Sequence, residues 1–154
     1  MNIGEMCSRV VVLAHRDTPL SEVSKLMREH HVGSVVIIED STRGRLPIGI
    51  ITDRDIVIEV IAMDMDCNEV SAGDIMSGEL VTVLEDESII NALRLMRRRG
   101  VRRLPVLTQT GTLAGIVTLD DIMEIVGEEF VGITKTIASE QSKELHSRKP
   151  FMQN

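Results

Sequence analysis

The sequence predicts an α/β fold built from two similar units, each with the element order strand, helix, strand, strand, helix. The first observation is internal repetition, because residues 3–61 and 72–129 follow one template. A well-matched segment is Gly49–Ile56, which recurs as Gly115–Ile122. The second is that, within each copy, short β-branched runs alternate with apolar residues at helical spacing. The third is that Gly-containing turns separate the last two strands of each copy. A repeat of this extent indicates units that stack on one another.

The first strand and helix of each copy follow from short apolar runs. The β-rich runs are residues 10–13 and 80–83. Each is followed by apolar side chains at helical spacing, which are Leu20, Val23, Leu26 and Met27 in the first copy and Ile89, Ala92, Leu93 and Met96 in the second. Thr18 and Pro19 suit the start of a helix. Gly33 and Gly100 suit the ends of these two helices.

A hairpin follows in each copy, with Gly44 and Gly111 in the loops. The expected strands are residues 34–39 and 48–52 in the first copy, and residues 103–107 and 113–118 in the second. The first loop is three residues longer, which suits a surface loop.

Second helices are expected after Thr52 and after Thr118. The last one keeps a helical apolar rhythm to Ile137, so we expect one long or broken helix, with Gly127 and Gly132 as weak points. Its apolar stripe suits either its own module or a partner helix. From residue 139 onward the polar chain is expected to be loosely ordered.

Domain boundaries follow from the repeat. A first repeat is expected at residues 1–62, a linker at 63–71, a second repeat at 72–130, and a helical extension with a polar tail at 131–154. A small sheet with helices on one face must bury its other face, and the twin unit is the natural partner. Two units that fill the chain leave no room for a catalytic domain, and no nucleophile-plus-base arrangement stands out. We therefore expect no enzyme.

Composition narrows the class of protein. The net charge of −7, with two Phe and no Trp or Tyr, disfavours nucleic-acid binding, which depends on cationic and stacking side chains. No apolar run has membrane-spanning length, and the N-terminus does not have the form of a signal peptide, so we expect a cytoplasmic protein without membrane contact. The two cysteines are expected to be reduced.

The strongest local signal is Gly-Ile-Ile/Val-Thr-x-x-Asp, present at 49–55 and 115–121. One interpretation is a helix cap, since Thr and an acid three residues later form a capping box. The other is a ligand site, in which the acid accepts the hydroxyls of a ribose and the Thr hydroxyl reaches a phosphate.

Basic residues separate the two copies. In a hairpin, Arg102 and Arg103 lie next to Thr118, whereas Gly33 and Ser34 lie next to Thr52. Alternation along a strand lets one of the two arginines face a cleft, where a guanidinium suits a phosphate. In the first copy the only similar candidate is Arg54. We therefore expect unequal sites, with the second binding phosphate more strongly.

These motifs, together with residues 101–106 (Val-Arg-Arg-Leu-Pro-Val) and the Asp-Ile-Met at residue 74, make the chain similar to a tandem pair of CBS domains, known as a Bateman module. The resemblance covers Gly4 to about Glu129. It implies two repeats related by a pseudo-twofold axis, with sheets packed together. It also implies clefts between them for AMP, ADP, ATP or S-adenosylmethionine, and pairing of two modules into a homodimer.

By the same resemblance, the ribose-binding acids are Asp55 and Asp121. The phosphate-side residues are Thr52, Arg54, Arg102, Arg103 and Thr118. The apolar residues Val12, Ala14, Val81 and Val83 are candidates for the adenine, although each also suits an ordinary core strand. The implied function is a stand-alone sensor of an adenosyl ligand that signals to an unknown effector protein.

Two alternatives stay open. One is an interaction module with empty clefts, whose C-terminal helix is the working surface. The other, less favoured, is a metal or redox sensor that uses His30 and His31 with Cys7, His15 and Cys67. No metal-ligand spacing supports it, so no metal site is assigned.

Overall fold

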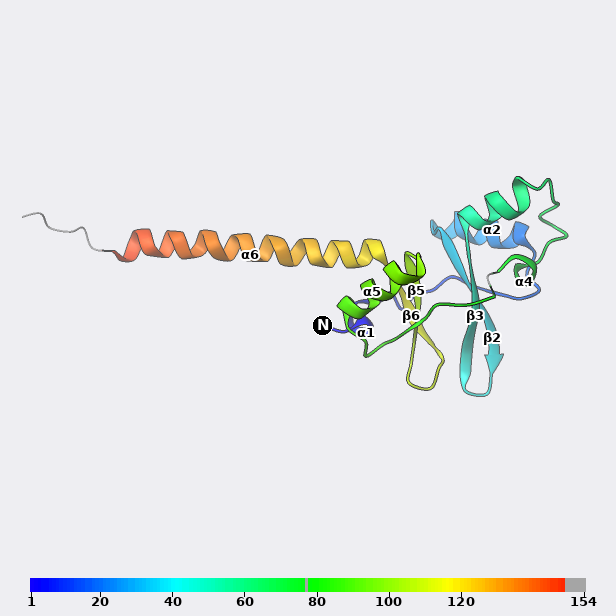
Figure 1. Cartoon of the computed structure of the whole chain (residues 1–154), viewed down its shortest axis with the longest axis horizontal. Coiled ribbons are helices and arrows are strands. Elements are labelled where there is room, and N and C mark those ends of the chain that lie inside the picture. The colour runs from blue at the N-terminus through cyan, green and yellow to red at the C-terminus, as the bar shows by residue number, and fades with distance from the viewer. Residues whose placement is uncertain (77, 149–154) are drawn as a thin grey trace, which may run out of the picture. The chain divides into compact units, whose positions relative to one another are not determined.

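The computed structural model describes residues 1–76 and 78–148 of the chain (Figure 1). Contacts divide the chain into two compact units, Met1–Leu119 and the segment that begins at Asp120. The first unit holds two three-stranded sheets with helices, which confirms the predicted α/β class and the duplicated order of elements. The second consists of one helix in its described part.

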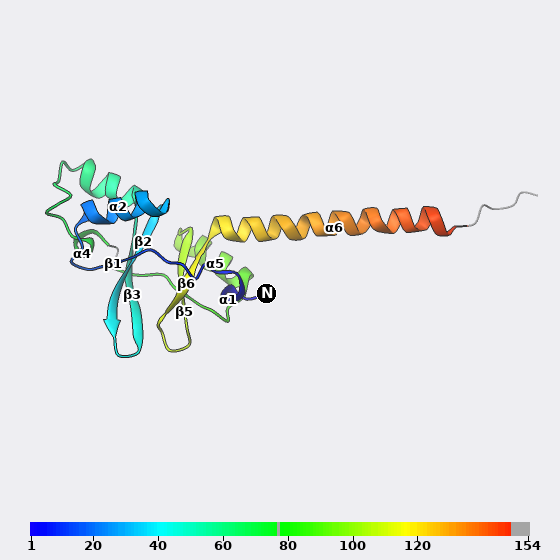
Figure 2. The same ribbon diagram turned by 180° about the vertical axis from the view of Figure 1, so that it is seen from behind.

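Each sheet has its strands in sequence order, with a parallel first pair and an antiparallel hairpin. Figure 2 shows the two hairpins. The first sheet contains β1 (Leu13–His15), β2 (Ser34–Ser41) and β3 (Gly44–Thr52), and the second contains β4 (Val83–Leu84), β5 (Arg103–Leu107) and β6 (Leu113–Thr118). Both hairpins carry a bulge at the corresponding place, after Ile37 and after Val106. The repeat therefore includes a shared local irregularity of the ladder, although the strands of the first hairpin are longer.

The structure corrects several predicted strand boundaries. Both first strands begin later than the apolar runs, at Leu13 and Val83, because pairing with the hairpin, not β propensity, defines the strand. The first hairpin does not have the longer loop that was predicted. Its strands extend until Ser41 pairs with Gly44, so the additional residues lengthen the ladder. Gly44 permits the tight turn with a φ of 129°.

The helices are α2 (Leu20–His30), α5 (Ile89–Arg99) and α3 (Asp53–Ile56), and α3 runs directly into a π-helix, η1 (Val57–Ile61). Gly100 ends α5 in the left-handed conformation, as predicted for a C-terminal glycine. In the first copy, however, His31 takes that conformation with a φ of 53°, so the assignment of Gly33 as the helix stop was wrong.

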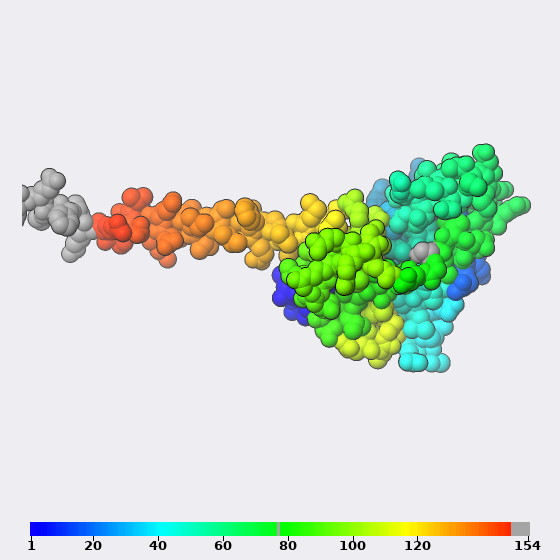
Figure 3. Space-filling model, in the orientation of Figure 1, coloured from blue at the N-terminus to red at the C-terminus, as the bar shows by residue number. Residues whose placement is uncertain are grey.

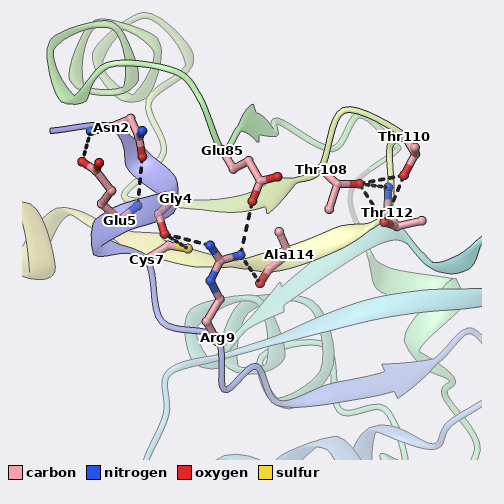
Figure 4. A network of polar contacts seen from close by, with 10 residues as sticks. All are labelled: Asn2, Gly4, Glu5, Cys7, Arg9, Glu85, Thr108, Thr110, Thr112 and Ala114. Carbon is pink, nitrogen blue, oxygen red and sulfur yellow. Dashed lines mark hydrogen bonds and ion pairs between the residues drawn. The ribbon is translucent and has the colours of Figure 1, made fainter.

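The short helix that opens each repeat contacts the other repeat. Helix α1 (Ile3–Met6) leads to Ser8, whose N–H and carbonyl each form a 2.9 Å hydrogen bond with Ile116 of β6. Figure 4 shows Arg9 strengthening this contact by donating to the carbonyls of Gly4 (2.8 Å) and Ala114 (3.1 Å). The N-terminal segment therefore adds a paired residue to the edge of the second sheet.

Helix α4 (Ala72–Ile75) makes the reciprocal contact with the first repeat. The N–H of Ala72 donates to the carbonyl of Thr18 at 2.8 Å, and Met76 packs so closely on Gly49 of β3 that a Cβ there would lie 2.6 Å from its sulfur. The hairpin loops also touch, since a Cβ on Gly44 would lie 3.2 Å from Thr112 (Figure 3). The two repeats are thus tied together by exchanged segments.

The core of the first unit is aliphatic. A cluster of buried side chains joins α2 to the first sheet, and it contains Ala14, Leu20, Val23, Met27, Val35, Ile37, Ile51, Ile56, Val60, Val70 and Ala72. Burial of such side chains contributes about 1.5–3 kcal/mol each for the larger ones. This core holds the ends of β2 and β3 in place, where the candidate site lies.

Helix α6 (Leu119–Ser147) is one long helix, which is one of the two predicted forms, and it runs without a break through Gly127 and Gly132. It corrects one prediction, because it continues through Ser139, where loose order was expected. The residues after 148 lie outside the described part. Among the described helices, none is both long enough and apolar enough to cross a membrane.

Candidate functional site

The first Thr-x-x-Asp motif forms a helix cap at the junction of β3 and α3. The Oγ1 of Thr52 accepts from the N–H of Asp55 at 3.1 Å, and the Oδ2 of Asp55 accepts from the N–H of Thr52 at 2.8 Å. Both side chains are half-buried. The cap interpretation is therefore confirmed, and the cap also fixes the direction of the carboxylate, since one of its two oxygens is held.

A capping box by itself does not indicate a ligand. Asn2 and Glu5 make the same reciprocal bonds at the start of α1, at 3.0 and 2.8 Å. Ser71 donates to Asp74 at the start of α4, from its N–H at 2.9 Å and from its hydroxyl at 3.0 Å. The residues around each cap therefore decide whether a capped helix start can also be a binding site.

The second motif has the backbone placement that the repeat predicts. Thr118 ends β6 and pairs in register with Arg103, just as Thr52 pairs with Ser34. Asp121 lies in the first turn of α6. The copies differ directly after the threonine, where Asp53 in one corresponds to Leu119 in the other.

The side chain of Arg103 reaches the first repeat. A Cβ on Gly33 would lie 3.0 Å from its Nη2 and 3.3 Å from the Oδ2 of Asp53. Gly33, Asp53 and Arg103 therefore meet at the end of β3 that carries Thr52. The first copy itself has no cation at the corresponding strand position, where Ser34 stands in place of Arg103. The second repeat supplies that cation, and the absence of a side chain at Gly33 makes room for it.

Arg102 lines a different place. It belongs to a cavity of about 540 Å³ between α5 and the start of β5, with an apolar floor and further arginines. The lining residues are Ile90, Leu93, Arg94, Met96, Arg97, Gly100, Val101, Arg102 and Leu119. Because successive side chains of a strand point to opposite faces, only one of the two neighbouring arginines faces the first repeat.

The other predicted residues have mixed placements. Arg54 is exposed in the first turn of α3. Of the adenine candidates, Ala14 and Val83 are buried at 5% and 6% exposure, whereas Val12 and Val81 are half-buried. The two half-buried side chains are the more accessible to a ligand.

Asp53 is the residue near this site that sequence reasoning missed. It follows the motif threonine, and in isolation it is one more acid in the first turn of a helix. Its proximity to Arg103 depends on how the two repeats pack, and no local pattern encodes that packing. In the sequence, the position of Asp53 was marked only by the difference between the copies, since Leu119 stands at the corresponding place in the second repeat.

The weaker candidates do not converge. His15 contacts Asp40 at 2.9 Å, and both line a cavity of about 710 Å³ at the loop end of the first sheet, away from Thr52. Within residues 1–76 and 78–148, no three His, Cys, Asp or Glu side chains group in a way that suits a metal ion. Cys7 is buried, and burial raises the pKa of its thiol.

Comparison with known proteins identifies the family. The CBS-domain family model matches residues 3–62 and 72–128, which are the two copies of the repeat. The chain belongs to the CBS-domain family. An uncharacterized Methanopyrus kandleri protein is 42% identical over 125 residues, which cover 81% of this chain but only 62% of that protein. Hypoxic response protein 1 of Mycobacterium tuberculosis is 35% identical over 140 residues, or 90% of this chain and 91% of the relative.

Solved CBS-domain structures confirm the fold. The crystal structure of hypoxic response protein 1, which has two coordinated zinc ions, superposes with a TM-score of 0.71 at 32% identity over 80% of this chain and 98% of its own. A CBS domain pair in complex with methylthioadenosine and S-adenosylmethionine gives a TM-score of 0.73, covering 84% of this chain and 98% of its own. At 24% identity this second likeness concerns the fold alone.

Proposed function

We propose that this CBS-domain chain is a non-catalytic regulatory module that senses an adenosine-containing ligand between its two repeats. The observation that carries the proposal is the position of Arg103. Its guanidinium lies beside Gly33 and Asp53, and among the described residues it has no hydrogen-bond or ion-pair partner. A guanidinium in this position can form charge-assisted hydrogen bonds with an anionic group of a ligand.

The neighbouring groups suit the rest of such a ligand. Asp55 would accept the ribose hydroxyls through the carboxylate oxygen that its cap leaves available. The Thr52 hydroxyl and the Arg103 guanidinium would hold a phosphate or carboxylate group of the ligand. AMP, ADP, ATP and S-adenosylmethionine share the adenosyl part and differ in the charged part. Arg103 would therefore be the residue that determines which of these ligands binds most tightly.

In the second cleft the corresponding groups would be Thr118 and Asp121. Because Arg103 lies at the first cleft in this proposal, the first site would bind phosphate more strongly. The sequence alone had predicted that the second site would. Ligand binding would favour one relative arrangement of the repeats, by no more than the difference in affinity between the arrangements. A homodimer of modules would pass that state to an effector protein.

Isothermal titration calorimetry with AMP, ADP, ATP and S-adenosylmethionine tests the proposal. Arg103→Ala removes a charge-assisted hydrogen bond of about 1.5–3 kcal/mol, so the affinity for the preferred ligand should fall about 10- to 100-fold. Asp55→Ala should cause a loss of similar size, and Asp121→Ala a smaller one. Arg43→Ala, a change in the exposed hairpin loop, is the matched control.

Absence of heat and of any thermal shift with all four ligands would refute the sensor and support an interaction module instead. Equal losses for Asp55→Ala and Asp121→Ala would refute the inequality while leaving the sensor intact. Metal analysis of the purified protein separately tests a zinc-binding alternative, which the zinc ions of the hypoxic response protein structure suggest.

A further inference from the structure

The described part of α6 carries a continuous apolar stripe that its own unit does not cover. Met123, Val126, Phe130, Ile133 and Ile137 are exposed at 63%, 53%, 67%, 58% and 52%. The unit that begins at Asp120 contains one helix in its described residues, and that helix cannot bury its own face. A long helix of this kind owes its stability to packing of its apolar face more than to propensity.

The spacing of the stripe indicates what covers it. The steps from Met123 to Ile137 are three, four, three and four residues, which is the a and d pattern of a heptad repeat. A mean period of 3.5 residues keeps a stripe facing a second helix that winds around the first in a left-handed sense. The pattern therefore fits a helix as partner better than a sheet or a flat surface.

Charge determines the direction of pairing. Residues 120–129 contain five acidic side chains and no basic one, whereas residues 130–148 contain Lys135, Lys143 and Arg148 against Glu140 and Glu144. Two parallel copies of this helix would place the acidic segments side by side. Two antiparallel copies about a twofold axis at Phe130 keep the acidic segments apart, since each then lies beside residues 131–140 of the other, which contain Lys135 and Glu140, and they also oppose the helix dipoles.

We propose that the stripe is the seam of an antiparallel pair formed by α6 of two copies of this chain. The outer members of the stripe, Met123 and Ile137, each lie seven residues from Phe130, whereas Val126 and Ile133 lie four and three residues from it. A twofold axis at Phe130 therefore sets Met123 against the partner copy's residue 137. This self-complementary contact is what an isologous interface requires. The proposal is independent of ligand binding.

Sedimentation equilibrium of the full chain tests the seam. Phe130→Glu combined with Ile133→Glu should halve the mass of the assembly, and helix content by circular dichroism should fall as the helices separate. Val131→Glu is the matched control, because Val131 is exposed at 50% on the same helix but lies outside the heptad pattern. An unchanged mass in the double variant, or an equal change in the control, would overturn the proposal.

Cysteine crosslinking tests the direction independently. In a background with Cys7→Ala and Cys67→Ala, an oxidised equimolar mixture of Met123→Cys and Ile137→Cys chains should crosslink, since a disulfide needs Cα atoms within about 7 Å. Neither variant alone should crosslink efficiently. Crosslinking of Met123→Cys with itself would show a parallel pair, and absence of any crosslink would show that something other than a second copy covers the stripe. Either result would overturn the proposal.

Discussion

The guanidinium of Arg103 lies against Gly33, with its Nη2 3.0 Å from the point where a Cβ on residue 33 would be. This contact joins two positions at which the repeats differ. Gly33 stands where the second repeat has Arg102, and its lack of a side chain opens the first repeat to a cation from the second. Two residues that differ between the copies, Gly33 and Arg103, therefore meet at one place in the folded chain.

The first prediction concerns the effect of adding a side chain at Gly33. In Gly33→Ala the new Cβ would crowd both Arg103 and Asp53, whose flexible side chains can move apart. We expect ligand affinity to fall about tenfold or more, because the guanidinium leaves its position, while the free energy of unfolding changes by less than about 1 kcal/mol. Calorimetric titration and urea denaturation measure the two quantities.

Gly78→Ala is the control for this change, since a Cβ there would meet nothing within 4 Å. It should leave affinity unchanged. If Gly33→Ala binds every adenosyl ligand as tightly as the wild type does, the contact between Gly33 and Arg103 has no part in binding.

The exchanged N-terminal segment gives the second prediction. A Cβ on Gly115 would lie 2.5 Å from the carbonyl oxygen of Ser8 and 2.8 Å from the sulfur of Cys7. Because backbone cannot yield as a flexible side chain can, Gly115→Ala should destabilise the protein by about 1–3 kcal/mol. Gly127→Ala in α6 meets nothing within 4 Å and should instead stabilise its helix by roughly 0.5–1 kcal/mol. Urea denaturation compares them, and equal stability would argue against the packed segment.

The third prediction distinguishes the capping role of Thr52 from a role in ligand binding. Thr52→Ala and Ser71→Ala each remove the hydroxyl of a capping residue, so each should cost about 0.5–2 kcal/mol of stability. Only Thr52→Ala should also weaken the binding of an adenosyl ligand, because Thr52 directly precedes Asp53, which meets Arg103 at Gly33. If calorimetry shows that the two variants bind equally well, Thr52 is a cap and nothing more.

The fourth prediction concerns acid stability. Hydrogen bonds from the Ser71 N–H and hydroxyl hold the pKa of Asp74 below its usual 3.8. Those from the Asn91 side chain and the Ser88 N–H hold the pKa of Glu87 below its usual 4.5. A depressed pKa stabilises the fold above the unfolded-state value, and this contribution is lost as the pH falls through the folded-state value.

The variants Asp74→Asn and Glu87→Gln should therefore melt at lower temperature than the wild type near pH 6. Their differences from the wild type should shrink as the pH is lowered, starting near 4.5 for Glu87→Gln and near 3.8 for Asp74→Asn. Thermal melts followed by circular dichroism from pH 6 to pH 3 measure this. A difference that grows toward acid would contradict the sign.

Much of the fold was readable from local pattern. The order of elements, the hairpin register that pairs Arg103 with Thr118, and the left-handed Gly100 follow from periodicity and turn chemistry, which act over a few residues. The predictions that failed depended on distant partners. The first strands start where pairing with β2 and β5 begins, and His31 replaces Gly33 as the helix stop.

By itself, the sequence determined that this chain is a tandem CBS-domain pair with a Thr-x-x-Asp motif at a strand-to-helix junction in each repeat, because each motif lies in adjacent residues. Only the tertiary structure decided that α1 docks on the second repeat and α4 on the first, and that Arg103 reaches Gly33 and Asp53. These contacts join residues that are far apart in the chain and are selected by the packing of two folded units. The repeat in the sequence does not indicate which of the two copies a given side chain contacts in the folded protein.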